Sequence, residues 1–176
     1  MSEDAYVSIG TNLGDRDAHL ALALRRLAEL PETALTAVSP VFETDPVGPP
    51  PQGPFLNAVA KLRTELGPRA LLDALLAIER EAGRVRSVPN AARSLDLDLL
   101  LHGERVLDEP GLTLPHPRLA ERPFVLEPLT ALAPRLVHPT LGEPIAALAA
   151  RVRDPRAVRP LGACEGIGDR AARRRR

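Results

Sequence analysis

The first part of the chain passes from the apolar pattern of a strand to that of a helix. A short apolar run over 5–9 predicts a buried strand, and the segment 10–14, with a glycine at each end, predicts the turn that closes it. Asp15 or Asp17 stands where a helix cap is expected. The helix is predicted by leucines at helical spacing, Leu20, Leu24, Leu27 and Leu30. A strand followed by a helix therefore begins the fold.

The middle of the chain repeats this alternation around a proline-rich interruption. Segments 34–44 and 55–65 predict a second and a third strand. Between them, 45–54 holds five prolines and two glycines, which excludes regular structure there. Pro68 then opens a second helix that Gly83 ends. One face of this helix is apolar and carries Leu71, Leu75, Ile78 and Ala82.

The remaining pattern completes an α+β fold. Segment 84–92 predicts a polar loop, and 95–101 predicts a fourth strand, followed by a short hairpin around Gly103. Two further helices are predicted over 124–133 and 144–152. The order β-α-β, β-α-β is that of the ferredoxin-like split motif. We therefore predict a ferredoxin-like βαββαβ core, an antiparallel sheet with helices packed on one face.

Composition and charge exclude several classes of protein. The 176 residues, 44% hydrophobic and 26% charged, predict one folded domain over 1–165 and an arginine-rich, unstructured tail over 166–176. The net charge is zero and the tail is basic, so the body is slightly acidic, unlike a nucleic-acid-binding domain. No apolar run is long enough to span a membrane. An acidic start unlike a signal peptide and a lone cysteine, Cys164, favour the cytoplasm.

The stretch Asp96-Leu97-Asp98 carries the first candidate chemistry. In a strand, side chains two positions apart share a face, so the two aspartates project together while the leucines enter the core. Carboxylates this close repel unless a cation neutralises them, and Mg²⁺ prefers oxygen ligands of this kind. The alternative is an amphipathic strand whose acidic residues face water.

Arginines and aromatic residues add to this candidate site. Arg84, Arg86 and Arg93 precede the aspartates, in the arrangement of a metal–triphosphate site or of a salt-bridged surface. Phe55 and Asn57 share a strand face, and would suit a flat heterocycle unless the phenylalanine is simply core. The only lysine, Lys61, lies outside any P-loop motif, so a P-loop nucleotide site is excluded.

Together these stretches resemble one family, the 6-hydroxymethyl-7,8-dihydropterin pyrophosphokinases of folate biosynthesis. The resemblance runs from Tyr6 to about Pro139. It is carried by the segments 8–15, Thr44 with 46–48, 55–57, Ile78-Glu79 with 83–86, 93–98, 114–117 and 122–124. It implies a pyrophosphokinase domain over 1–165 that transfers the β,γ-diphosphate of ATP to the pterin alcohol and releases AMP.

The resemblance also implies a role for individual residues. Asp96 and Asp98 would hold two Mg²⁺ ions, and Arg84 and Arg93 would stabilise charge at the β-phosphorus. ATP would be held by Glu79, Arg86, Arg93, Leu99, Thr113, His116 and Arg122. The pterin would be held by Thr44, Val47, Phe55, Asn57 and Phe124. The partners would be these two small molecules, with no nucleic acid and no membrane, and the protein would act as a monomer.

The sequence departs from the family pattern at a few loop positions. Many members have a tryptophan in the loop before Arg93, and 88–92 has none; Asp45 stands where proline often follows the threonine. Pro117 replaces a frequent tyrosine, and Ser87 stands at a position that can be lysine. Two other functions remain as alternatives: a ferredoxin-like RNA-binding module, and another D-x-D metal-dependent transferase.

Overall fold

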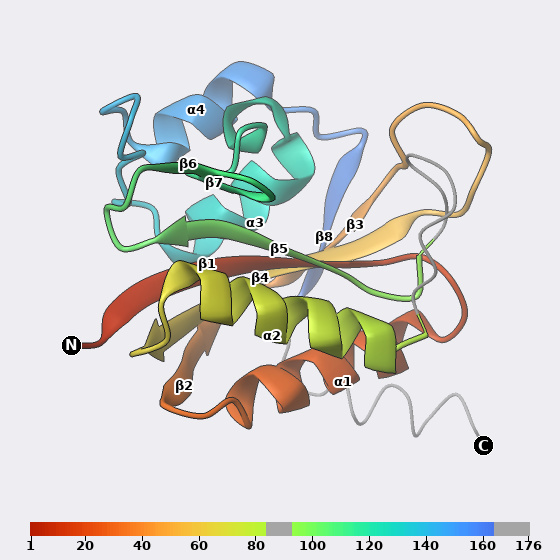
Figure 1. The fold of residues 1–176 in the computed structure, drawn as a ribbon. Coiled ribbons are helices and arrows are strands. Elements are labelled where there is room, and N and C mark those ends of the chain that lie inside the picture. Colours follow the sequence, from red (N-terminus) through yellow and green to blue (C-terminus); the bar gives the residue numbers. More distant parts are fainter. Residues whose placement is uncertain (84–92, 164–176) are drawn as a thin grey trace.

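The core of the protein is an antiparallel sheet that crosses the middle of Figure 1. The computed structural model describes residues 1–83 and 93–163. Within these residues the strand order is β5-β1-β4-β3-β8, and β2 also pairs with β4. The strands are β1 (Glu3–Thr11), β2 (Thr33–Val38), β3 (Val41–Thr44), β4 (Phe55–Thr64), β5 (Asp96–His102) and β8 (Val158–Gly162).

Helices and a small hairpin surround this sheet. The helices are α1 (Arg16–Ala28), α2 (Pro68–Glu81), α3 (Pro123–Leu132) and α4 (Ile145–Val152), with a 3₁₀ turn over Leu119–Glu121. The hairpin joins β6 (Leu107–Glu109) to β7 (Leu112–Leu114). The order of elements from β1 to β5, and the placing of β1 between β4 and β5, confirm the predicted βαββαβ core.

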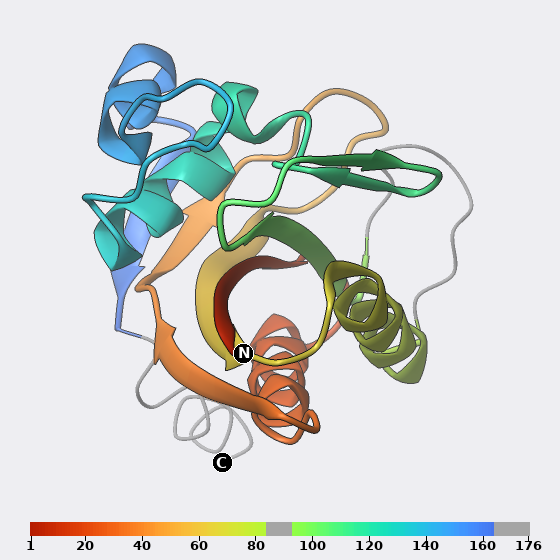
Figure 2. The same ribbon diagram turned by 60° about the vertical axis from the view of Figure 1, so that its left-hand side comes forward.

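Helices cover both faces of the sheet. The two helices of the βαββαβ core, α1 and α2, share one face as predicted, whereas the covering of the other face by α3 and α4 was not predicted. α1 and α2 bury one face, in a core that includes Val7 and Leu62. α3 and α4 bury the other, in a core that includes Tyr6 and Leu101. Figure 2 shows the twisted sheet between these two helix layers. The reason lies in β1, which is buried continuously from Ala5 to Thr11, as strands covered on both sides are.

Two strands differ from their predicted form. The predicted second strand is divided at Ser39 and Pro40, because proline cannot donate a ladder hydrogen bond, and β2 and β3 result. β8 was not predicted, because it contains Pro160 and proline argues against a strand. It pairs with β3 at the edge of the sheet. The edge of the sheet is therefore formed by a segment distant in sequence.

The predicted helix ends are confirmed, whereas the predicted hairpin was misplaced. Asp15 caps α1 by accepting a hydrogen bond from the Ala18 amide at 3.0 Å. Gly83 follows α2 with a φ of 77°, a left-handed conformation that favours glycine. The hairpin turns between β6 and β7, while Gly103 lies in the turn that follows β5. The predicted loop 84–92, the domain boundary at 165 and the tail 166–176 lie outside the described residues.

None of the helices in residues 1–83 and 93–163 combines the length and apolarity that a bilayer crossing requires.

Candidate active site

The two aspartates of the D-x-D stretch lie where neighbouring strands bring polar positions to one face. Ser8 of β1 pairs with Asp98, and Gly10 pairs with Asp96. On its other side, Gly10 pairs with Asn57 of β4. The leucines next to the aspartates are buried in the core, so the two carboxylates share a face, as their spacing predicts.

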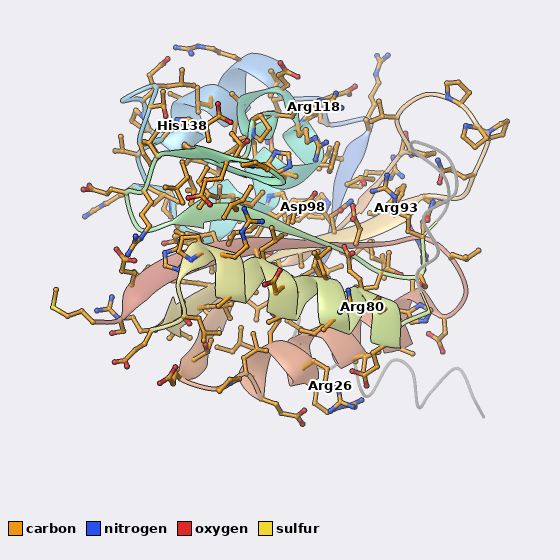
Figure 3. The ribbon with its side chains drawn as sticks, viewed as in Figure 1. Arg26, Arg80, Arg93, Asp98, Arg118 and His138 are labelled. Atoms are coloured by element: carbon orange, nitrogen blue, oxygen red, sulfur yellow. The ribbon has the colours of Figure 1, made fainter. Side chains whose placement is uncertain are left out.

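Each aspartate has an arginine close to it. Arg93 Nη1 contacts Asp96 Oδ2, and Arg122 Nη1 lies 3.4 Å from Asp98 Oδ2. Figure 3 shows Asp98 on β5 and Arg93 beyond the start of that strand. Burial raises the pKa of Asp98 to about 6, the charge of Asp96 adds to the rise, and the two arginines oppose it. The site therefore holds negative charge that the arginines only partly balance.

A cavity with an empty volume of about 780 Å³ opens beside the aspartates; we call it the aromatic cavity. It is lined by all the residues predicted to bind the heterocycle, Thr44, Val47, Phe55, Asn57 and Phe124. Asn57 Nδ2 donates a hydrogen bond of 2.5 Å to Thr44 Oγ1. Arg122 lies over the Phe124 ring, 5.7 Å from its centre. The cavity thus combines aromatic surface with a fixed amide, which suits a flat molecule with polar edges.

A second cavity, with an empty volume of about 1450 Å³, lies between α2, β5 and β7; we call it the α2 cavity. Four residues predicted to hold the nucleotide line it, Glu79, Leu99, Thr113 and His116. Arg93 and Arg122 line the aromatic cavity instead, and Arg84 and Arg86 lie outside the described residues. Asp98 lines both cavities. A ligand in one cavity can therefore meet a ligand in the other at this carboxylate.

Comparison with known proteins identifies the family to which a chain with these features belongs. The model of the 7,8-dihydro-6-hydroxymethylpterin-pyrophosphokinase (HPPK) family matches residues 6–134. The chain belongs to the HPPK family. It is 50% identical to a 2-amino-4-hydroxy-6-hydroxymethyldihydropteridine pyrophosphokinase of Pseudomonas aeruginosa over 136 residues, 77% of this chain and 84% of that protein. The enzyme of the same name in Bacillus subtilis is 41% identical over 132 residues, 75% of this chain and 79% of that protein.

Solved structures agree with this assignment at the level of the fold. The HPPK-DHPS protein of Plasmodium falciparum superposes with a TM-score of 0.67 at 13% identity. The match covers 86% of this chain and 44% of the Plasmodium chain, so this chain spans less than half of that protein. The family model and the curated relatives confirm the suspected family, and the structural likeness confirms the predicted α+β fold.

The hydrogen bonds of Glu79, which is buried, and of His116, which is half-buried, define their roles in this HPPK-family site. Glu79 is only 3% exposed and accepts a hydrogen bond of 2.9 Å from the Leu97 amide, so it supports β5 between the two aspartates. The pKa of His116 is lowered to about 4, first by burial and then by the charge of Arg122. His116 Nδ1 accepts from the Arg118 amide at 3.2 Å. A neutral His116 therefore carries its proton on Nε2, as a donor.

Several residues that build the site had no predicted role. Asn12 joins three segments: its amide donates to Gln52 Oε1 at 2.7 Å and to the Gly53 carbonyl at 3.1 Å, and its Oδ1 accepts from the Arg93 amide at 2.7 Å. Gln52 and Arg118 line the aromatic cavity. The signal for Asn12 was its place in segment 8–15, which carried the family resemblance. Its role depends on contacts between distant segments, which no spacing reveals.

The donors present fit magnesium. Within residues 1–83 and 93–163, no group of three or more histidines, cysteines or acidic residues could hold a metal ion by itself. Asp96 and Asp98 supply oxygen ligands only. Burial and then the charge of Asp96 raise the pKa of Asp98, and a cation bound beside it would favour the ionised carboxylate. Mg²⁺ is commonly held by one or two carboxylates together with phosphate and water. The pair therefore suits a metal that arrives with a phosphate ligand.

The packing around Gly10 predicts the effect of one added methyl group. A Cβ at this position would lie 3.0 Å from Asn57 Oδ1, and Thr44 already restrains that amide. We expect Gly10→Ala to raise the KM for the pterin about tenfold, because the amide must move and the methyl group enters the cavity. Steady-state kinetics measure this. Gly67→Ala is the matched control, since a Cβ there meets nothing within 4 Å; equal effects of both changes would contradict the expectation.

The raised pKa of Asp98 predicts a pH-dependent difference in stability. As pH rises from about 4 to about 6, the unfolded chain loses this proton while the folded, metal-free protein retains it, so Asp98 makes the fold less stable. Asp98→Asn removes this contribution. We expect its free energy of unfolding to exceed that of the wild type at pH 7 but not at pH 4, by at most about 3 kcal/mol. Urea unfolding with EDTA measures it; a constant difference across pH would show that the pKa is normal.

Proposed function

We propose that this HPPK-family chain transfers the β,γ-diphosphate of ATP to the hydroxymethyl group of 6-hydroxymethyl-7,8-dihydropterin. The hydroxymethyl oxygen forms a bond to the β-phosphorus, the bond from that phosphorus to the α,β-bridging oxygen breaks, and AMP leaves. The hydroxyl proton is released. The observation that carries the proposal is that Asp98 lines both the aromatic cavity and the α2 cavity, so the two substrates meet at the aspartates.

The pterin belongs in the aromatic cavity. Phe55 and Phe124 offer apolar ring faces, and Asn57 offers an edge that can both donate and accept. Thr44 fixes the amide, because its hydroxyl oxygen accepts one of the two amide protons. Asn57 is therefore oriented before the ligand arrives, and its position distinguishes heterocycles with matching edge groups from those without them.

The nucleotide belongs in the α2 cavity. Leu72 and Leu76 give one wall an apolar surface suited to a base, while Thr113 and His116 offer a hydroxyl and a ring N–H for oxygen atoms. The neutral state of His116 matches a role as hydrogen-bond donor. Glu79 keeps β5 in place through its bond to the Leu97 amide. ATP bound here would direct its phosphates toward Asp98.

Charge stabilisation falls to the aspartates and arginines. We assign two Mg²⁺ ions to Asp96 and Asp98; when bound, they neutralise phosphate charge and polarise the oxygens at the reacting phosphorus. Arg93 and Arg122 contact the two aspartates. When ATP binds, their guanidinium groups can form hydrogen bonds to phosphate oxygens in place of these carboxylates. Arg84 and Arg86 are assigned to the same phosphates from the sequence alone.

Product analysis tests the proposal. Purified protein is incubated with magnesium, ATP and the hydroxymethyl dihydropterin, and the products are separated by chromatography and mass spectrometry. We expect AMP and a pterin diphosphate in equal amounts, and neither product with EDTA. Release of ADP, or transfer of a nucleotide, would favour another D-x-D transferase. RNA binding without pterin turnover would favour the RNA-binding module.

The setting of the reaction follows from the same features. Residues of one chain line both cavities, so we propose that a monomer suffices and that its partners are the two small substrates. A single cysteine and a slightly acidic body favour the cytoplasm, away from membranes and nucleic acids.

A further inference from the structure

The outer wall of the aromatic cavity is a segment without regular secondary structure. Residues 45–54 connect β3 to β4, and Asp45, Pro46, Val47 and Gln52 of this segment line the cavity. We call it the wall segment. Val47 is 60% exposed, so the core does not hold the wall in place. Polar contacts hold it instead: the Asn12 side chain binds Gln52 and Gly53 near its end, and further contacts are made at Asp45 and Pro54.

Both ends of the wall segment are held by arginines that meet at Glu43. At the start, Arg159 Nη2 lies 2.9 Å from Asp45 Oδ1 and 3.7 Å from Glu43 Oε1. At the end, Arg16 Nη1 donates to the Pro54 carbonyl at 3.0 Å and to Glu43 Oε2 at 3.1 Å. Glu43 therefore links the two arginines, one at each end of the segment. We call Arg16, Glu43 and Arg159 the arginine clamp.

Strand geometry places the clamp outside the cavity. Adjacent side chains in β3 point to opposite faces, and Thr44 faces the cavity, where it receives the Asn57 hydrogen bond. Glu43 therefore points away from the cavity. Arg159 of β8 pairs with Glu43 in the strand register, and Arg16 is the first residue of α1. The clamp therefore lies behind the pterin site and contacts the wall segment at Asp45 and Pro54.

Charge and hydrogen bonding favour a fixed clamp. Arg159 lowers the pKa of Asp45 through a side-chain hydrogen bond, so this carboxylate stays ionised at neutral pH. A single exposed ion pair is worth little, but here two arginines share one carboxylate. Glu43 and both arginines are also half-buried rather than fully exposed. The Asp45 amide adds a hydrogen bond of 2.9 Å to the Ala157 carbonyl.

We propose that the arginine clamp is a positioning device for the pterin, which holds the wall segment beside the aromatic cavity. The inference rests on the proposed function for the identity of the ligand. Arg159 lies beyond residues 6–134, the part that the family model matches. A residue of the C-terminal strand thus acts on the affinity for the pterin without touching it.

The test separates binding of the two substrates. We expect Arg159→Ala to raise the KM for the pterin about three- to tenfold, with the KM for ATP and kcat within twofold of wild type. Arg159→Lys, which keeps the charge and an ammonium donor but loses the planar fork, should recover at least half of the loss. The matched control is Arg156→Ala, three residues earlier. Its side chain is exposed, and its backbone carbonyl, which accepts a hydrogen bond of 2.5 Å from Arg159 Nη1, is kept by the substitution. An unchanged KM for the pterin in Arg159→Ala, or equal rises in both KM values, would overturn the proposal.

Two further measurements keep the outcome decisive. Hydrogen exchange without ligands should be faster at the wall-segment amides in Arg159→Ala than in Arg156→Ala; equal rates would also overturn the proposal. If Arg159→Ala does not fold, Asp45→Asn removes the same ion pair with little change in shape, and the same kinetic result is required of it. A wild-type protein without pterin turnover would refute the proposed function, whereas normal turnover with unaffected variants would refute the clamp alone.

Discussion

The Asp98→Asn variant is expected to lose at least about 100-fold in turnover while its fold is retained. Within the described residues, Asp98 alone lines both cavities, so its carboxylate is where a metal can contact both substrates. Asparagine keeps the size of the side chain but removes the charge that holds a cation. A metal clamp stabilises the transition state by several kcal/mol, which corresponds to a loss of two or more powers of ten.

The measurement is kcat at saturating magnesium, ATP and pterin, with circular dichroism to verify folding. Asp96→Asn should behave in the same way, because it shares the face of β5 and the proposed metal site. Asp73→Asn, an exposed aspartate on α2, is the control and should keep full activity. Activity above about a tenth of wild type in Asp98→Asn would contradict the metal assignment, since a metal clamp is worth more than one power of ten.

The Arg93→Ala variant is expected to lower kcat about 100- to 1000-fold, with a smaller effect on either KM. Arg93 contacts Asp96 and lines the aromatic cavity, so its guanidinium lies beside the proposed place of diphosphate transfer. The charge that develops on the phosphoryl oxygens needs a donor already in position. Removing such a donor affects the transition state more than the ground state.

Local structure should survive this substitution. Asn12 fixes the backbone of Arg93. The Arg93 N–H donates to Asn12 Oδ1 at 2.7 Å, and the backbone N–H of Asn12 donates to the Arg93 carbonyl at 3.0 Å. Neither bond involves the Arg93 side chain. Arg93→Lys should restore part of kcat but not all, because lysine lacks the planar fork of donors. Arg25→Ala, exposed on α1, is the control. A loss confined to the KM for ATP would indicate a role in binding alone.

Local patterns predicted the parts of the site that depend on short spacing. Asp96 and Asp98 share a face because strand side chains alternate, and this holds whatever packs around the strand. Asp15 predicted the start of α1, and Pro68 and Gly83 predicted the start and the end of α2. These predictions succeed because a helix cap acts within one turn. In the aromatic cavity, strand spacing indicated Phe55 and Asn57, whereas Thr44, Val47 and Phe124 came from the family resemblance alone.

Contacts between distant segments could not be predicted in this way. Asn12 joins residues about 40 and 81 positions away, and Arg159 reaches a residue 114 positions away. Such partners depend on how the sheet closes, which short-range patterns do not encode. The second helix layer was missed because the continuous apolar run of β1 was taken only as a buried strand. A run without alternation in fact indicates packing on both faces.

The pairing of β8 with β3 also has a consequence for synthesis of the protein. Arg159 is added 114 residues after Asp45, which at about 5–20 residues per second means roughly 6–23 s. During this time the outer edge of β3 has no strand beside it. An unpaired edge offers its amides and carbonyls to any other extended chain. On the ribosome, a growing chain that lacks β8 therefore has a wall segment without its Arg159 contact. It also has a free edge of β3 that can pair with extended segments of other chains.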